Sequence, residues 1–239
     1  MTDSLKEYIM SLGADLAGFA DLTSLPGDRR ADMLYGIAIA IAVDPAIVPF
    51  IPERATMEYY NEYQRINEKL DMISLAVQEH LSQQGYTAIA QTVGFVKKQR
   101  AQNDPQPDSR ASMPHKTVAA LAGLGWIGKS SLLITERYGS AVRISSVLTD
   151  APLAVNNAVY KCLCGSCRVC GEACPGHVIK GREWTMDTDR DDLIDFYACR
   201  ETVRKRGETL GIDHGACGIC MAVCPYTQRY VRYNNGKNE

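Results

Sequence analysis

Apolar residues recur along this chain at two different spacings, and the change between them predicts both helices and strands. A step of three or four residues predicts a helix over residues 4–12 that ends at Gly13. The same step predicts a much longer helix over residues 53–84, whose apolar positions are Tyr59, Tyr63, Ile66, Leu70, Ile73, Val77 and Leu81. Both segments therefore offer one apolar face for packing on a sheet.

Near-continuous apolar runs predict the strands of that sheet. Residues 34–43 form an almost unbroken aliphatic run that stops at Asp44 and Pro45, which is typical of a strand buried on both faces. Shorter runs predict further strands over residues 15–20, 86–93 and 140–149.

A polar, proline-containing segment interrupts this pattern. Residues 101–114 hold three prolines and predict a loop, and Pro114 begins a predicted helix that runs to Leu124. A second helix is predicted over residues 189–206. Helices and strands interleave without a strict βαβ repeat, which indicates an α+β fold.

Two cysteine motifs near the C-terminus are typical of ferredoxins that hold 4Fe-4S clusters. Their spacings are C-x2-C-x2-C-x3-C-P and C-x2-C-x3-C-P, at Cys164, Cys167, Cys170, Cys174 and Pro175, then Cys217, Cys220, Cys224 and Pro225. In such a run three thiolates bind one cubane cluster and the fourth binds its neighbour. The motifs therefore predict two 4Fe-4S clusters and electron transfer.

The second motif is one ligand short, because His214 stands where its first cysteine would be. Cys199 is the only cysteine between the motifs, so we assign it as the missing ligand, with His214 as the alternative. Cys162 is then left over. The predicted sets are Cys164, Cys167, Cys170 and Cys224 for cluster 1, and Cys174, Cys199, Cys217 and Cys220 for cluster 2.

Other cysteine sites explain less of the pattern. A zinc ribbon on Cys167, Cys170, Cys217 and Cys220 would leave five cysteines and both Cys-Pro endings unexplained. A plant-type 2Fe-2S site on Cys162, Cys167 and Cys170 would ignore the second motif. A disulfide framework does not suit a chain of this length without a secretory leader, so we expect a cytoplasmic protein.

Composition agrees with a globular protein, with 46% hydrophobic and 23% charged residues. The longest apolar run, Ile37 to Val43, is far shorter than the roughly 18–20 residues that span a bilayer, so we expect no membrane association. A net charge of −2 argues against a nucleic-acid-coating surface. Residues 97–143 do carry eight basic and three acidic side chains, which fits either an anion-facing surface or a solvated one.

A glycine-rich segment satisfies two nucleotide-binding patterns at once. Gly123, Gly125 and Gly128 fit G-x-G-x-x-G, and the following Lys129-Ser130 completes a P-loop pattern. Both motifs need a strand directly before the glycines, whereas residues 115–122 are predicted to be helical, so we do not expect nucleotide binding. We predict a turn that approaches a large flat or anionic ligand, or alternatively one in which Trp126 fills the core.

The chain resembles the epoxyqueuosine reductase family, whose relatives include the reductive dehalogenases. The resemblance is carried by residues 122–135, Tyr138-Gly139, residues 147–153 and the double-cluster pattern. It implies a nitroreductase-like, cobalamin-binding domain over residues 1–155, followed by a ferredoxin-like double 4Fe-4S domain over residues 156–239. The implied cofactor-binding residues are Gly123, Gly125, Trp126, Gly128 and Lys129, and FMN is the alternative cofactor.

Two departures from the tRNA-modifying members concern the substrate. Their proton-donating aspartate corresponds, without gaps, to Ser109, with Asp108 adjacent. The chain also ends soon after Pro225, without the helical repeats that would help hold tRNA, so tRNA is not expected as a partner. His115 is then a candidate proton donor and Lys116 a candidate anion ligand, unless both simply lie exposed at a helix N-terminus.

The sequence thus predicts an iron–sulfur oxidoreductase. A low-potential donor such as ferredoxin or flavodoxin would reduce one cluster, and electrons would pass through the second cluster to cobalamin and an unidentified small-molecule substrate. One alternative is a non-catalytic electron carrier or redox partner of a corrinoid protein. The other is an epoxyqueuosine (tRNA) reductase.

Overall fold

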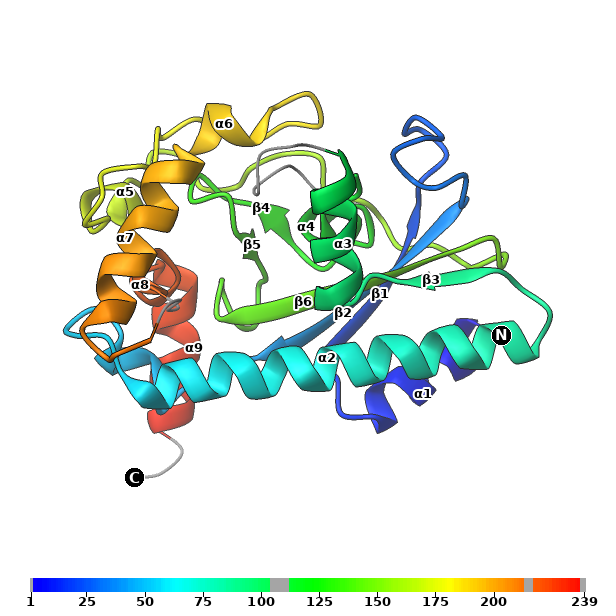
Figure 1. Ribbon diagram of the computed structural model, residues 1–239, viewed down its shortest axis with the longest axis horizontal. Helices are drawn as coiled ribbons and strands as arrows, with labels where there is room; N and C mark the ends of the chain where they lie inside the picture. The colour runs from blue at the N-terminus through cyan, green and yellow to red at the C-terminus, as the bar shows by residue number, and fades with distance from the viewer. Residues whose placement is uncertain (1, 104–111, 213–216, 237–239) are drawn as a thin grey trace. The chain divides into compact units, whose positions relative to one another are not determined.

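The computed structural model describes residues 2–103, 112–212 and 217–236 of this 239-residue chain. Helices and strands occur in mixed order, so the predicted α+β class is confirmed (Figure 1). In chain order the elements are α1 (Thr2–Ser11), β1 (Leu16–Asp21), β2 (Tyr35–Ala42), the 3-10 helix η1 (Val48–Phe50), α2 (Met57–Gln83), β3 (Ala88–Ala90), α3 (Val93–Asn103), α4 (His115–Leu121), β4 (Trp126–Ile127), β5 (Leu133–Ile134), β6 (Val142–Thr149), α5 (Val169–Glu172), α6 (Arg190–Leu193), α7 (Phe196–Glu208), α8 (Ile219–Ala222) and α9 (Pro225–Asn235).

Two segments differ from the sequence-based expectation. The predicted strand over residues 86–93 holds only the short β3, and α3 begins at Val93 and runs into the predicted loop. Helix α3 has no clear apolar stripe, and its first turn is held by caps: Thr92 Oγ1 accepts the N–H of Phe95 at 3.2 Å, and an Asp71 carboxylate oxygen accepts that of Val93 at 2.9 Å. Residues 104–111 of the predicted loop, including Asp108 and Ser109, lie outside the described residues.

The single helix predicted over residues 189–206 is divided into two. Helix α6 ends at Ile194, whose backbone is extended, and α7 begins directly after it. Each helix has its own aspartate cap, because the side chain of Asp189 accepts the N–H of Asp191 and that of Asp195 accepts the N–H of Ala198. The break therefore follows from two caps six residues apart in one polar segment.

The larger sheet has the strand order β1-β2-β6-β3. Strands β1 and β2 pair antiparallel from Leu16 opposite Ala40 to Asp21 opposite Tyr35, and β3 pairs antiparallel with β6. The interior positions of β2 are all buried, as the unbroken aliphatic run predicts. Strands β4 and β5 form a separate two-stranded pair.

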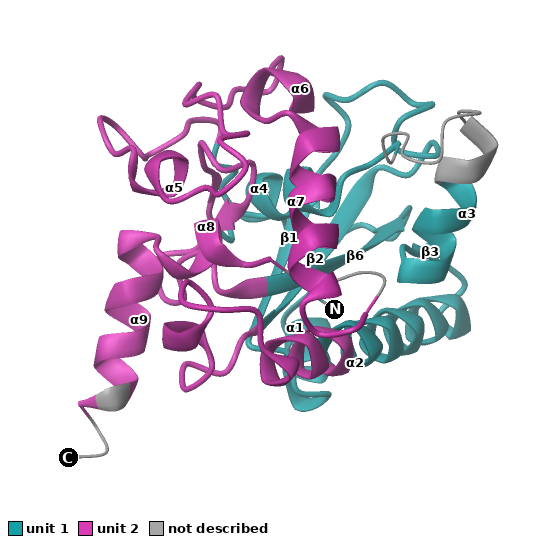
Figure 2. Ribbon diagram, turned by 60° about the vertical axis from the view of Figure 1, so that its left-hand side comes forward, with its two compact units in different colours: residues 1–41, 66–124, 143–159 teal, residues 42–65, 125–142, 160–239 magenta. Residues whose placement is uncertain are grey.

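The chain divides into two compact units, which Figure 2 shows in different colours. Unit 1 comprises residues 1–41, 66–124 and 143–159, and unit 2 comprises residues 42–65, 125–142 and 160–239. Every cysteine of the chain falls in unit 2. The two-domain division at residues 155 and 156 stays a prediction, while the units show that two earlier segments pack with the cysteine-rich one.

Unit 1 has the amphipathic packing that its apolar spacing predicts. The buried side chains of α2 within this unit follow the predicted stripe, at Ile66, Leu70, Ile73, Val77 and Leu81. Helix α4 lies close to the sheet because two strand positions lack a side chain: a Cβ on Gly18 would come within 2.5 Å of the Ala122 carbonyl, and one on Gly36 within 2.7 Å of Val118.

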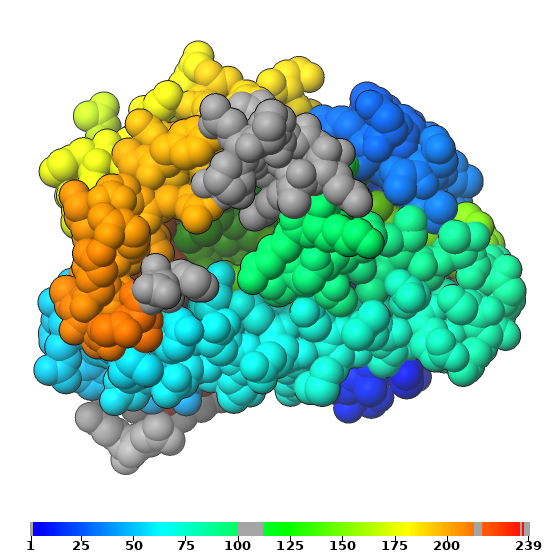
Figure 3. Space-filling view, viewed as in Figure 1, coloured from blue at the N-terminus to red at the C-terminus, as the bar shows by residue number. Residues whose placement is uncertain are grey.

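In unit 2, helix α7 lies on the surface of the face seen in Figure 3, where it is orange. Its exposed side carries ion pairs of Arg204 with Glu201 and Glu208. Among the helices of the described ranges, none is both long and apolar enough to cross a bilayer.

Truncation of the α2 stripe tests the packing of unit 1. We expect Leu81→Ala, at a side chain with no exposed surface, to lower the free energy of unfolding by about 2–5 kcal/mol, because it removes buried methyl groups and leaves a cavity. Leu75→Ala on the same helix is the matched control, since that side chain is 50% exposed. Urea unfolding followed by circular dichroism measures both, and equal losses would contradict this packing.

Candidate functional site

The first cysteine motif lies on a turn and a short helix. The amide of Cys167 donates to the carbonyl of Cys164 at 3.1 Å, which closes the turn between the first two cysteines. Cys170 lies within α5, and Cys174 follows the end of that helix. One helical turn thus separates consecutive cysteines, and a short segment presents several thiols.

The second motif repeats this arrangement. Cys220 lies within the four-residue helix α8, and Cys224 caps α9, whose first residue is Pro225. Proline suits the first helical position because its missing N–H has no intrahelical partner there. Helices α5 and α8 pack against each other, which brings the two motifs together.

Cys199 reaches the second group from helix α7. The start of this helix is tied to the segment after the first motif, because Asp195 N–H donates to the Val178 carbonyl at 2.9 Å. The same segment also approaches α7 closely at Gly176, where a Cβ would lie 2.3 Å from Thr202 Oγ1. The backbone therefore carries Cys199 towards Cys174, although the two are far apart in sequence.

The two earlier segments of unit 2 anchor the second motif. Ser140 N–H donates to Thr227 Oγ1 at 3.0 Å, and the Tyr230 hydroxyl donates to the Val43 carbonyl at 3.1 Å. The ring of Tyr59 lies against Gly218, where a Cβ would come within 2.6 Å of it. These buried contacts explain why residues 42–65 and 125–142 pack with the cysteine-rich segment.

Mutual repulsion among thiolates reveals which cysteines lie close together. Burial first, and then the thiolates of Cys164, Cys167 and Cys224, raise the pKa of Cys170 to about 11. Burial also raises the pKa of Cys199, and its thiolate neighbours are Cys217 and Cys174. The first group has the members predicted for cluster 1, and the second has three of the four predicted for cluster 2.

The pKa of Cys220 is raised by burial first and then by thiolates of both sets, those of Cys217, Cys199, Cys170 and Cys174. The sets are therefore neighbours. In the described part of the chain, no three His, Cys, Asp or Glu side chains converge on a position for a single metal ion. Thiols arranged around a cubane bind different iron atoms, so they do not need to converge on one point.

Cys162, which the ligand assignment leaves over, lies beside Cys164. Its thiol donates a hydrogen bond to the Cys164 sulfur, which raises the pKa of Cys162 and lowers that of Cys164. Sequence spacing had assigned Cys162 no role, because a C-x-C pair is not part of either motif.

The glycine-rich segment supplies further neighbours of Cys164. Trp126 is buried and packs edge-on against Tyr226, with ring centroids 4.9 Å apart. Its indole N–H has no hydrogen-bond partner among the described residues, and it lies near Cys164, whose pKa it helps to lower. A Cβ on Gly128 would lie only 3.3 Å from that sulfur, so glycine is needed for this close approach.

Lys129 is buried in the same place, with 9% of its surface exposed. Its ammonium group donates to the carbonyl oxygens of Gly165, at 2.5 Å, and Cys167, at 3.3 Å. Its backbone N–H also donates to the Cys164 sulfur. A cation is thereby fixed beside the turn that carries the first two cysteines.

The other two glycines of the motif make room for the chain itself. A Cβ on Gly125 would lie 2.0 Å from the Ile134 carbonyl, across the β4-β5 pair, and one on Gly123 would lie 2.6 Å from the Asn157 carbonyl. The contacts that we see at the predicted cofactor-binding residues are thus with other residues of the same chain. Their role in binding cobalamin stays a prediction.

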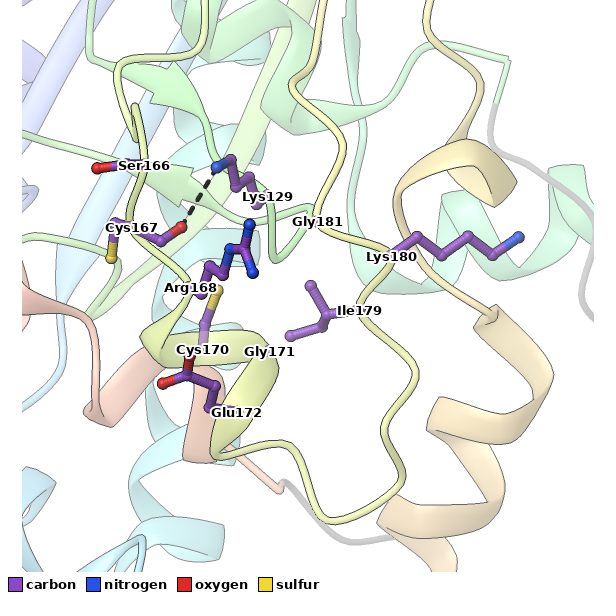
Figure 4. Close-up of a pocket in the computed structure, with 10 residues that line it drawn as sticks. All are labelled: Lys129, Ser166, Cys167, Arg168, Cys170, Gly171, Glu172, Ile179, Lys180 and Gly181. Atoms are coloured by element: carbon purple, nitrogen blue, oxygen red, sulfur yellow. Dashed lines mark hydrogen bonds between the residues drawn. The ribbon is translucent and has the colours of Figure 1, made fainter.

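A cavity of about 420 Å³ opens next to the first motif (Figure 4). It is lined by Lys129, Ser166, Cys167, Arg168, Cys170, Gly171, Glu172, Ile179, Lys180 and Gly181. The guanidinium of Arg168 points into the cavity, whereas Lys180 extends away from it to donate to the Asp191 carbonyl at 2.7 Å. The cavity thus has a basic lining beside Cys167 and Cys170.

The candidate catalytic residues His115 and Lys116 form the first turn of α4, in unit 1. His115 Nδ1 lies 2.9 Å from Ser146 Oγ, and this hydroxyl donates to Gln91 Oε1 at 3.4 Å. In the first of these hydrogen bonds the tautomer of the ring decides which atom donates. Both candidate side chains are half-buried, which contradicts the alternative of a fully exposed pair. His214 lies outside the described residues.

Comparison with known proteins supports the cysteine assignment at the level of the domain. Residues 163–227 match the family model for a 4Fe-4S double cluster binding domain. Epoxyqueuosine reductase of Synechococcus sp. RCC307 is 25% identical over 97% of this chain and 77% of its own length. That of Synechococcus sp. CC9605 is 36% identical over 50% of this chain and 37% of its own length.

Solved structures show the same fold. One is a reductive dehalogenase whose structure is described with a mechanism for B12-dependent dehalogenation. The aligned region covers 98% of this chain and 33% of the dehalogenase chain, with a TM-score of 0.69 and 18% sequence identity. Another is an epoxyqueuosine reductase with an epoxyqueuosine-modified tRNA-Tyr stem loop. Here the aligned region covers 95% of this chain and 65% of the reductase chain, with a TM-score of 0.57 and 20% sequence identity. The chain spans less than two thirds of most of these proteins. Over most of its length the chain is similar to the epoxyqueuosine reductases, and residues 163–227 match a 4Fe-4S double cluster binding domain.

Proposed function

We propose that this protein is an iron–sulfur reductase that uses two 4Fe-4S clusters and a cobalamin to reduce epoxyqueuosine in tRNA. The observation that carries the proposal is the gathering of thiols from both motifs around Cys170 and Cys220, within the segment that matches the double-cluster family. The related proteins are named as reductases, which supports an enzyme over a non-catalytic carrier.

The two thiol sets fit the clusters that we assign to them. Cluster 1 is held by Cys164, Cys167, Cys170 and Cys224, and cluster 2 by Cys174, Cys199, Cys217 and Cys220. Soft thiolates are the ligands that such clusters take, and bound iron offsets the mutual repulsion that raises the thiol pKa values. Bound clusters supply one-electron steps. The chain's own contribution is to hold the eight sulfurs on α5, α7, α8 and the start of α9.

The cobalamin proposal rests on the family resemblance and on the B12-dependent dehalogenase that shares this fold. It does not rest on the five predicted binding residues, because their visible contacts are with Cys164 and with the chain's own carbonyls. We therefore assign no residue-level step to cobalamin. A nitroreductase-type first domain belongs to the same proposal.

The proposed tRNA substrate replaces the expectation from sequence that tRNA is not a partner. The named relatives are epoxyqueuosine reductases, and one solved relative holds a modified tRNA stem loop. An electron donor such as ferredoxin or flavodoxin remains part of the proposal.

His115 is our candidate proton donor. Opening an epoxide requires a proton on the oxygen whose bond to carbon breaks. We assign the proton of the bond to Ser146 to Nδ1, because the serine hydroxyl donates to Gln91, and histidine is the side chain that most often serves as a general acid. Gln91 is buried and fixes the serine, so the imidazole has one preferred orientation.

The ligand assignment predicts iron content. Anaerobically purified protein should contain about eight irons and eight sulfides, as two cubanes require. Cys199→Ala should lose about half of both, because it removes a ligand of cluster 2, whereas Cys162→Ala should keep both clusters. Iron and sulfide analysis measures this. Full iron content in Cys199→Ala together with loss in His214→Ala would show that histidine is the eighth ligand.

The proposed activity predicts turnover only when both cofactors are present. We expect dithionite-reduced protein supplied with cobalamin to remove the epoxide oxygen from epoxyqueuosine tRNA, detected by mass spectrometry of the nucleosides. The Cys199→Ala protein is the control. Turnover with FMN instead would contradict the cobalamin proposal. Turnover of halogenated aromatics but not of the tRNA would assign a dehalogenase, and no turnover of either would favour the carrier.

Replacement of the candidate acid predicts a separate effect. His115→Gln should slow substrate reduction by about 10²- to 10⁴-fold, the range typical of general acid catalysis, while dithionite reduces the clusters at the wild-type rate. His80→Gln on α2 is the matched control, because that ring stacks on Tyr8 instead. Steady-state rates of the three proteins at pH 7 measure the difference. Equal rates for all three would exclude His115 as the donor.

A further inference from the structure

The sulfur of Cys164 has an unusual set of neighbours. A Cβ on Gly128 would lie 3.3 Å from it, so the backbone leading to Lys129 passes close to the sulfur. The buried indole of Trp126 and the thiol of Cys162 are further donor groups around it. The Lys129 ammonium is held nearby by the carbonyls of Gly165 and Cys167. One cysteine of cluster 1 thus sits in a shell of donors and positive charge.

The Trp126 indole would be poorly placed if it only filled the core. A buried N–H without an acceptor is destabilising because it has lost its hydrogen bond to water, and Trp126 Nε1 has no acceptor in the described ranges. A thiolate that binds iron is an anionic acceptor, so it gives this N–H a partner. Tyr226 packs edge-on against the indole and limits its orientation, because the two rings are 78° apart.

The Lys129 side chain is also placed in a way that a surface lysine is not. It is 9% exposed, so water screens its charge weakly. The two carbonyls that hold it belong to the turn that carries Cys164 and Cys167, so the charge stays close to the same cluster. Gly128, directly before it, brings this backbone within reach of the Cys164 sulfur.

We propose that Trp126 and Lys129 are positioning residues that raise the reduction potential of the cluster bound by Cys164, Cys167, Cys170 and Cys224. The inference rests on the proposed ligand assignment. Reduction adds one negative charge to a cluster, and hydrogen bonds and positive charge at its sulfurs stabilise the reduced form more than the oxidised form. The glycine-rich segment that resembles a nucleotide-binding loop thus sets how readily cluster 1 accepts an electron.

A redox titration of anaerobic protein, followed by electron paramagnetic resonance, tests this inference. Trp126→Phe keeps an aromatic ring against Tyr226 and removes the N–H, so it should shift one cluster to a more negative potential without loss of iron. Trp184→Phe is the control, because it alters the chain's other tryptophan, which is also buried. Repeating Trp126→Phe in the Cys199→Ala protein, which retains cluster 1, identifies the shifted cluster.

The lysine has its own pair of variants. Lys129→Met should shift the same cluster in the same direction, and Lys129→Arg should restore most of the wild-type potential because it keeps the charge. Lys180→Met is the control, since Lys180 lines the same cavity but extends away from the cysteines. If the Lys129→Met protein does not retain cluster 1, the redox titration of the Trp126→Phe protein tests the inference by itself.

Unchanged potentials in Trp126→Phe would overturn the inference, as would a shift confined to cluster 2. These outcomes do not depend on tRNA, cobalamin or turnover. Failure of the proposed substrate would leave the potential shift intact, and a missing shift in protein that contains eight irons would leave the proposed function intact.

Discussion

The mutual repulsion of crowded cysteine sulfurs is the constraint on which unit 2 depends. Burial and neighbouring thiolates raise the pKa values of Cys170, Cys199 and Cys220, because a charged sulfur is disfavoured away from water and beside other charged sulfurs. Bound iron and hydrogen-bond donors reverse this preference. The backbone must therefore hold the sulfurs close together before the binding of metal can stabilise the fold.

The scaffold achieves this with polar contacts from segments that hold no cysteine. Ser140 is bonded to Thr227, and Val43 accepts from Tyr230, so the second motif is tied to residues 125–142 and 42–65. Asp195 starts α7 beside the first motif and carries Cys199 with it. Since the Ser140–Thr227 and Tyr230–Val43 contacts are buried, they fix direction as well as proximity, which cluster ligands require.

The two units hold different parts of the proposed chemistry. Unit 2 holds the cysteines and the donors around Cys164, so it is the electron-carrying part. Unit 1 holds His115, whose imidazole is oriented through Ser146 and Gln91, so it is the part that offers a proton. A reductase needs both, and the relatives' names are consistent with this pairing.

Sequence alone predicted the elements whose signals are local. The apolar stripe of α2, the buried strand β2 and the cysteine spacing are each visible in neighbouring residues. The assignment of Cys199 as the eighth ligand, made because it is the single cysteine between the motifs, stays a prediction. The sequence pattern did not predict the start of helix α3 or the break before α7. Both are determined by side-chain caps, at Thr92 and Asp195, and not by apolar periodicity.

Only the tertiary structure decided what the glycine-rich segment does. Its glycines fit a phosphate loop by spacing, but the partners that require them are Ile134, Asn157 and the Cys164 sulfur, none of which a local pattern can reveal. The same holds for Lys129 and Trp126, whose neighbours come from a segment more than thirty residues later in the chain. A residue's type limits what it can bind, and the fold decides which partner it meets.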